Sequence, residues 1–136
     1  MTLAKPPKRG RKPRRRIRRQ AKRKAKLHDA DRLFSLYIRN RDGWACRACG
    51  SPISPQCAHI ISRRYRNLRW SPDNAVTLCQ KDHMKWTHNP LGWEVWVEER
   101  FPGRLSMLKA QALAGKKPVD YEAICRELRA AIGERE

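Results

Sequence analysis

The first 26 residues contain no acidic side chain, although they hold 14 of the 32 Lys and Arg residues of the chain. All 13 acidic residues follow, so the net charge of +19 is concentrated at the N-terminal end. This segment also has few apolar side chains, and a segment that cannot bury apolar surface does not fold alone. We therefore expect residues 1–26 to form a basic tail that is disordered in isolation or becomes partly helical on a polyanion.

Long apolar runs are also missing from the sequence. No stretch approaches the roughly 18 apolar residues that a membrane span requires, and no apolar segment follows the basic N-terminus as it would in a signal peptide. We expect a cytoplasmic protein without a membrane span. Its polycationic segment favours nucleic acid as the partner, because binding to polyphosphate releases counterions; RNA and acidic membrane surfaces attract such a segment too.

The chain lacks an even set of cysteines. It has five, at positions 46, 49, 57, 79 and 125. An odd number without a secretory signal argues against a disulfide framework. Two residues separate Cys46 from Cys49, which is the spacing of a zinc knuckle. Cys125 lies among apolar residues and is expected to be an ordinary buried thiol.

Apolar periodicity and turn residues predict a small α+β protein. A helix is expected over 28–43, begun by Asp29 or Asp31 and ended by Gly43. Residues 54–62 are expected to form a buried strand and 63–75 a polar loop, in which Pro72, Asp73 and Asn74 form a turn. A strand that turns into a helix is expected over 76–88. Three further helices are expected over 90–101, 105–115 and 120–134.

The polar residues of the central segment follow a distinctive order. They are Cys46, Cys49, His59, Asn74, Cys79, Asp82 and His83, within the stretches "CRAC", "AHIIS", "PDNAVTLC" and "CQKDH". This order resembles the HNH nucleases, the zinc-containing branch of the ββα-metal superfamily, and is most similar to phage recombination nucleases of the NinG type. The resemblance covers about residues 30–100. It implies a two-stranded antiparallel ribbon and a helix stapled by zinc, in a domain over 27–102 that is followed by a helical extension over 103–136.

The resemblance also implies a role for each residue. His59 would be the general base that activates water, His83 would bind a catalytic Mg²⁺ or Mn²⁺ ion, and Asn74 would order the loop and orient His59. A plain turn residue is the other reading of Asn74. These residue types suit the chemistry, since phosphodiester hydrolysis needs an activated water and a cation on the developing charge, and a histidine near neutral pKa can take the proton.

Two positions depart from the family pattern. Where the family has a fourth cysteine the chain has Asp82, whose carboxylate can complete a zinc site with Cys46, Cys49 and Cys79. His83 and Cys57 are the rival fourth ligands, and we favour Asp82. Many relatives also place a metal ligand directly before the catalytic histidine, where this chain has Ala58. This implies a catalytic ion held by few protein groups and several waters, as magnesium commonly is.

Basic residues surround these motifs and are expected to contact DNA phosphates. They are Arg63, Arg64, Arg66, Arg69, Lys81 and Lys85. The resulting hypothesis is a metal-dependent DNA endonuclease of low sequence specificity, which leaves 5′-phosphate and 3′-hydroxyl ends in phage recombination or DNA processing in the host cytoplasm. A homodimer through the C-terminal helices would let it cut both strands. The alternatives are a non-catalytic zinc-binding module that binds nucleic acid, and RNA binding through the basic tail.

Overall fold

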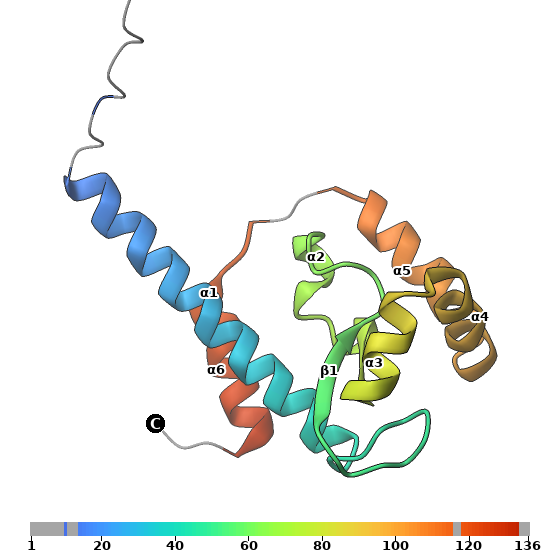
Figure 1. The fold of residues 1–136 in the computed structure, drawn as a ribbon. Helices are drawn as coiled ribbons and strands as arrows, with labels where there is room; N and C mark the ends of the chain where they lie inside the picture. Colours follow the sequence, from blue (N-terminus) through green and yellow to red (C-terminus); the bar gives the residue numbers. More distant parts are fainter. Residues whose placement is uncertain (1–9, 11–13, 116–117, 134–136) are drawn as a thin grey trace, which may run out of the picture.

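A small α+β architecture is present in the computed structural model, which describes residues 10, 14–115 and 118–133. It is mostly helical and contains a two-stranded antiparallel sheet (Figure 1). The elements in chain order are α1 (Arg14–Arg41), β1 (Pro55–His59), α2 (Arg66–Arg69), the 3₁₀ turn η1 (Pro72–Asn74), β2 (Ala75–Cys79), α3 (Gln80–Thr87), α4 (Pro90–Arg100), α5 (Arg104–Leu113) and α6 (Tyr121–Ile132). The expected loop over 63–75 thus contains one turn of helix and a 3₁₀ turn.

The two strands form a short ribbon that lies between helices. Its register pairs Pro55 with Cys79 at one end and His59 with Ala75 at the other. Because successive side chains of a strand point to opposite faces, Ala75 joins the core formed with α1, whereas Val76 joins a second core beside α3 and α4. The ribbon is therefore covered on both faces, and its two ends are the places where polar side chains can reach solvent.

The first helix begins much earlier than the sequence suggested. It starts at Arg14 and runs without interruption to Arg41, so the described part of residues 1–26 has the helical form of the two expected alternatives; residues 1–9 and 11–13 lie outside the described residues. No Gly or Pro interrupts the helix, and Arg, Lys, Gln and Ala are good helix formers. The packed half of α1 supplies the nucleus, and extending an existing helix costs far less than starting one.

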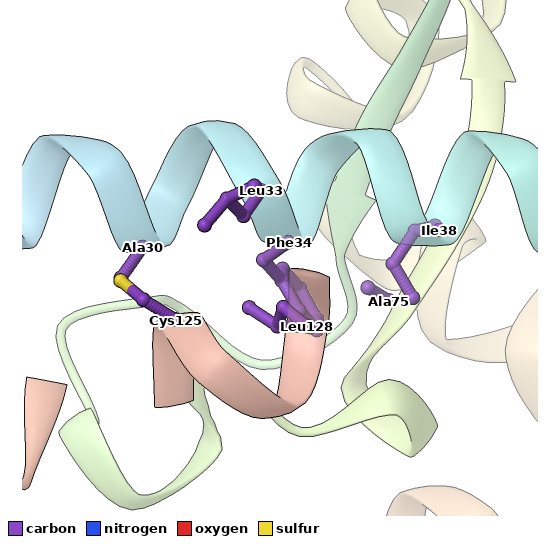
Figure 2. Close-up of a cluster of buried hydrophobic side chains, with 7 residues drawn as sticks. All are labelled: Ala30, Leu33, Phe34, Ile38, Ala75, Cys125 and Leu128. Atoms are coloured by element: carbon purple, nitrogen blue, oxygen red, sulfur yellow. The ribbon is translucent and has the colours of Figure 1, made fainter. Parts of the chain in front are cut away.

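The C-terminal half of α1 is fixed by α6. Figure 2 shows their shared core, to which the ribbon also contributes one residue. Its members are Ala30, Leu33, Phe34 and Ile38 of α1, Ala75 of β2, and Cys125 and Leu128 of α6. Leu108 of α5 lies in another core with Ile60, Leu68 and Val97. Helices after residue 102 therefore bury side chains together with residues that precede it.

Local signals for helix ends agree with the structure at several places. The Asp120 carboxylate accepts hydrogen bonds from the backbone N–H groups of Glu122 and Ala123, and begins α6 as expected. Gly43 has a φ of +68°, which suits the chain reversal after α1. Asp29 and Asp31, by contrast, lie inside α1 rather than at its start. None of the described helices has both the length and the apolar character needed to cross a membrane.

Candidate active site

A four-residue cluster lies at the Cys79 end of the ribbon. The ligand atoms of Cys46, Cys49, Cys79 and Asp82 all lie within 4.8 Å of one another. The Cys49 and Cys79 sulfurs are 3.7 Å apart, and the Cys46 sulfur is 3.2 Å from Asp82 Oδ2. Two thiolates on a tetrahedral zinc ion are about 3.8 Å apart, given a Zn–S distance of about 2.3 Å. This cluster can hold a metal ion, and its donor set is consistent with Zn²⁺.

Backbone hydrogen bonds shape the loop that supplies two of these ligands. The Cys46 N–H donates to the carbonyl of Ser51, and the Gly50 N–H donates back to the carbonyl of Cys46. Gly50 has a φ of +77°, a conformation that glycine adopts without steric cost. The Arg47 N–H donates to the carbonyl of Thr77 and ties the loop to β2. The knuckle conformation is thus built by the main chain.

The other two ligands come from the start of α3. Cys79 is the residue that caps this helix, and its sulfur accepts a hydrogen bond from the Asp82 N–H at 3.4 Å. Asp82 therefore lies in the first helical turn with its carboxylate beside the thiols. His83 and Cys57 are not members of the cluster. Among the described residues, Asp82 is the side chain that the fold brings to the fourth position, in agreement with the favoured alternative.

The pKa values of Cys49 and Asp82 are shifted in opposite directions. A hydrogen bond at Ser51 lowers the pKa of the Cys49 thiol, but Asp82 and the two other thiols outweigh it and raise that pKa to about 12. The pKa of Asp82 is lowered, chiefly by hydrogen bonding from Cys49. The Asp82 carboxylate is therefore charged, and the Cys49 thiol resists ionisation. A cation would reverse this resistance, because thiol ligands bind metals as thiolates.

His59 lies at the opposite end of the ribbon with one ring nitrogen occupied. Its Nε2 is 2.9 Å from the backbone carbonyl oxygen of Arg69. A carbonyl only accepts, so Nε2 carries the proton and Nδ1 of the neutral ring has the lone pair. The ring also stacks on Phe34, with 5.6 Å between ring centroids. Burial lowers the pKa of His59 below its usual 6.5, and the charge of Arg63 lowers it further.

Asn74 is fully buried and holds the loop that follows His59. Its Oδ1 accepts a hydrogen bond from the Ile61 N–H, and its Nδ2 donates to the carbonyls of Ile61 and Leu68. The Ile60 N–H donates to the Asn74 carbonyl as well. These contacts join Asn74 to the backbone of the loop, as its expected ordering role requires. Any effect on His59 passes through the loop backbone, since Asn74 does not bond to its ring in the described hydrogen bonds.

His83 projects from α3 toward the same cleft as His59. Its Nδ1 is 2.8 Å from Gln56 Oε1 of β1. This contact makes Nδ1 the protonated nitrogen and leaves a lone pair on Nε2, an arrangement typical of metal-binding histidines. Burial lowers the pKa of His83. Both histidines line one open cavity of ≈ 660 Å³, together with Arg63 and Cys57.

The expected DNA-binding residues divide into two groups. The Arg63, Arg64, Arg66, Lys81 and Lys85 side chains are exposed. Arg69 is not available in this way, because its guanidinium forms a two-pronged ion pair with Asp31 and its side chain is only 16% exposed. The expectation that Arg69 contacts DNA is therefore corrected: a partner on α1, 38 residues away, holds it inside the protein.

Three residues near the histidines were not singled out from the sequence as site residues. Asp31 binds Arg69, Gln56 binds His83 and Phe34 stacks on His59. Asp31 carried the clearest signal, since a carboxylate next to buried Ala30 and Leu33 requires a polar partner. Gln56 and Phe34 carried none, because their roles depend on contacts between distant segments.

Comparison with family models, with curated proteins and with solved structures finds no match to this chain.

Proposed function

We propose that this protein is a metal-dependent DNA endonuclease of the HNH type. The observation that carries the proposal is the shared cavity of His59 and His83, in which each ring has one nitrogen bonded to the protein and the other nitrogen free to act. The exposed Arg63 lines the same cavity and offers a forked cation to a phosphate. The cluster at the other end of the ribbon supports the proposal as a zinc staple.

His59 is the general base of the proposed reaction. Its Nδ1 lone pair takes a proton from a water molecule, whose oxygen attacks phosphorus in line with the leaving 3′ oxygen. The lowered pKa keeps the ring neutral, and so able to accept a proton, at neutral pH. The products carry 5′-phosphate and 3′-hydroxyl ends. Phe34 and the Arg69 carbonyl restrict the ring, so that the lone pair is already directed when the substrate arrives.

His83 is the residue that would hold the catalytic Mg²⁺ or Mn²⁺ ion, through Nε2. Such an ion supplies charge stabilisation at the phosphate and the leaving oxygen. Ala58, directly before His59, is buried and offers no ligand. The donor set thus fits an ion that is held mainly by water and DNA phosphate, which is how magnesium commonly binds. We expect weak metal affinity in the absence of DNA.

The proposed DNA contact extends beyond the cleft. The exposed basic residues near the cavity are joined by those in the N-terminal half of α1, which are Arg14, Arg15, Arg16, Arg18, Arg19, Lys22, Arg23 and Lys24. Lys26 pairs with Glu122 of α6 instead. In Figure 1 this half of α1 projects away from the rest of the fold. Contacts of this kind are made to phosphates and carry no base sequence. Binding should therefore show little sequence preference and a steep dependence on salt.

A supercoiled-plasmid assay tests the proposal. Wild type, His59→Ala and His88→Ala are each incubated with Mg²⁺, with Mn²⁺ and with EDTA, and DNA binding is measured in parallel. His88 is an exposed histidine at the end of α3 and serves as the matched control. We expect wild type and His88→Ala to nick the plasmid only with metal, and His59→Ala to bind normally and cut at least about 100-fold more slowly, the lower end of what a general base contributes.

Two results would contradict the proposal. Equal nicking by wild type and His59→Ala would exclude His59 as the base. Binding without nicking in every metal would instead support the non-catalytic zinc module, for which buried Ala58 is the structural argument. A branched junction is the second substrate to include, because the resemblance to phage recombination nucleases predicts faster cutting of branched than of plain duplex DNA.

A further inference from the structure

The carboxylate of Asp31 lies at the centre of a polar cluster that no part of the proposed chemistry uses directly. Its Oδ1 accepts hydrogen bonds from Arg69 Nε at 2.9 Å and from the Trp70 indole N–H at 3.0 Å, and its Oδ2 accepts from Arg69 Nη2 at 2.6 Å. Two parallel bonds from a guanidinium fix both the distance and the plane of the pair. Asp31 on α1 thus holds two consecutive residues of the α2 segment by their side chains.

The backbone of the same Arg69 bonds to the candidate base. Its carbonyl oxygen accepts the proton of His59 Nε2. One residue therefore connects the Asp31 carboxylate, through its side chain, with the His59 ring, through its main chain. Helix α2 has only four residues, so it has little stability of its own to keep this carbonyl in place.

The Asp31–Arg69 ion pair, called the clamp below, is largely buried. The Asp31 and Arg69 side chains are 23% and 16% exposed. Burial raises the pKa of Asp31, but the hydrogen bonds and charge of Arg69 lower it by more, so the carboxylate is ionised at neutral pH. On the far side, the Trp70 ring meets Tyr121 of α6 edge-on, with 5.5 Å between centroids. The segment is thus held between α1 and α6.

We propose that Asp31 is a positioning residue for the base: through Arg69 it holds the carbonyl that keeps the proton of His59 on Nε2 and the lone pair on Nδ1. The inference rests on the proposed function of His59. Without the clamp, the carbonyl would leave the ring, and the proton would distribute between the two nitrogens. Part of the protein would then present Nε2 rather than Nδ1 as the lone pair, in the wrong direction for the water.

The test uses the full-length protein with ¹⁵N-labelled histidine. The ring nitrogen shifts of His59 report which nitrogen carries the proton, and they are recorded above the pKa of the ring. The variants are Asp31→Asn, which keeps an acceptor for Trp70 but loses the charge, and Arg69→Lys, which keeps the charge but loses the fork. Asp29→Asn is the matched control, since Asp29 lies on the same helix and pairs with Arg129 and Arg32 instead. Thermal unfolding of each variant shows that it is folded.

We expect wild type and Asp29→Asn to show His59 protonated almost wholly on Nε2. Asp31→Asn and Arg69→Lys should show a mixture of the two forms. DNA cleavage by these two variants should fall about 10- to 100-fold, the usual range for a group that orients a functional side chain, while DNA affinity changes less than about twofold. If Asp31→Asn does not fold, Trp70→Phe removes one of the three bonds to the carboxylate and should give a smaller shift in the same direction.

The ring measurement separates this inference from the proposed function, because it needs neither DNA nor metal. Unchanged His59 nitrogen shifts in folded Asp31→Asn and Arg69→Lys would overturn the positioning role, whatever the cleavage rates. A clear mixture of protonation forms in a protein that never cuts DNA would retain the clamp and reject the nuclease.

Discussion

The two ends of the β1–β2 ribbon are built in different ways. At the Cys79 end, three thiols and a carboxylate converge within 4.8 Å, a set of groups that a cation would hold together. At the His59 end, neutral groups bond to one another: the His59 ring to a backbone carbonyl, and a buried asparagine to three backbone groups. Four residue steps along a strand, about 13 Å, separate them. The comparison teaches that one end gathers the donor atoms of a metal site, whereas the other end is held by hydrogen bonds within the protein.

Removing one ligand from the cluster at the Cys79 end should have the largest effect on stability. Cys79→Ser takes one ligand from the cluster and should lower the free energy of unfolding by at least about 4 kcal/mol, because the binding energy of a structural zinc ion is also folding energy. The measurement is urea unfolding together with the zinc content per chain. Cys125→Ala is the control, as it removes a buried thiol outside the cluster and should cost about 1 kcal/mol. Equal losses for the two variants, or protein purified without zinc, would contradict the assignment.

Removing the Asn74 side chain at the His59 end should lower the free energy of unfolding by less. Asn74→Ala removes a fully buried amide and leaves the N–H and the carbonyl of Ile61 without this partner, while the Leu68 carbonyl keeps the N–H groups of Trp70 and Ser71. We expect a loss of about 2–3 kcal/mol in urea unfolding, as is usual when buried polar groups are left unpaired. Asn67→Ala is the comparison, because Asn67 is half-buried and, among the described residues, its side chain forms one hydrogen bond, to the Gln111 carbonyl; its cost should stay below about 1 kcal/mol. A small effect of Asn74→Ala would show that the loop does not depend on it.

Lowering the pH protonates His59 without any substitution, and should have the smallest of the three effects on the ribbon. The pKa of His59 lies below 6.5 in the folded protein because burial disfavours its charged form. The base is therefore available above pH 6.5, and cleavage is lost as the pH falls through the lowered value. The same sign holds for stability: below pH 6.5 the unfolded chain binds the proton first, so this end of the ribbon is destabilised. Single-turnover cleavage rates and an NMR titration of His59 should give the same midpoint. A midpoint above 6.5 would contradict the buried neutral ring.

Local patterns predicted much of this molecule. The two strands, the helix after Cys79 and the cap at Asp120 follow from residues close together in the sequence. The knuckle spacing of Cys46 and Cys49 also found half of the candidate metal cluster, whereas Cys79 and Asp82 were expected from the resemblance to the HNH pattern. In each case the interacting groups lie within a few residues of one another, or share an element whose geometry is regular.

The errors came from distant contacts and from helix propagation. Arg69 was expected at the DNA surface because neighbouring arginines are exposed, but its partner Asp31 is 38 residues away in the sequence. The basic segment was expected to be disordered in isolation, or partly helical on a polyanion, because it has few apolar side chains to bury. Its helix from Arg14 onward instead continues one whose packing lies beyond residue 27. Neither effect can be read from a short window of sequence.

The unbroken course of α1 has a consequence for how a bound duplex would be oriented. One helix carries the basic residues from Arg14 at its exposed end and, further along, Asp31 and Phe34 beside His59. Each helical residue adds about 1.5 Å of length and about 100° of rotation. The number of residues between Arg14 and Asp31 therefore sets the distance between them along the helix, about 25 Å, and the angle between them around its axis. The same distance and angle would separate a DNA phosphate bound by the N-terminal half of α1 from the phosphate in the cleft. Under the proposed function, the length of α1 would determine which position along the duplex reaches His59.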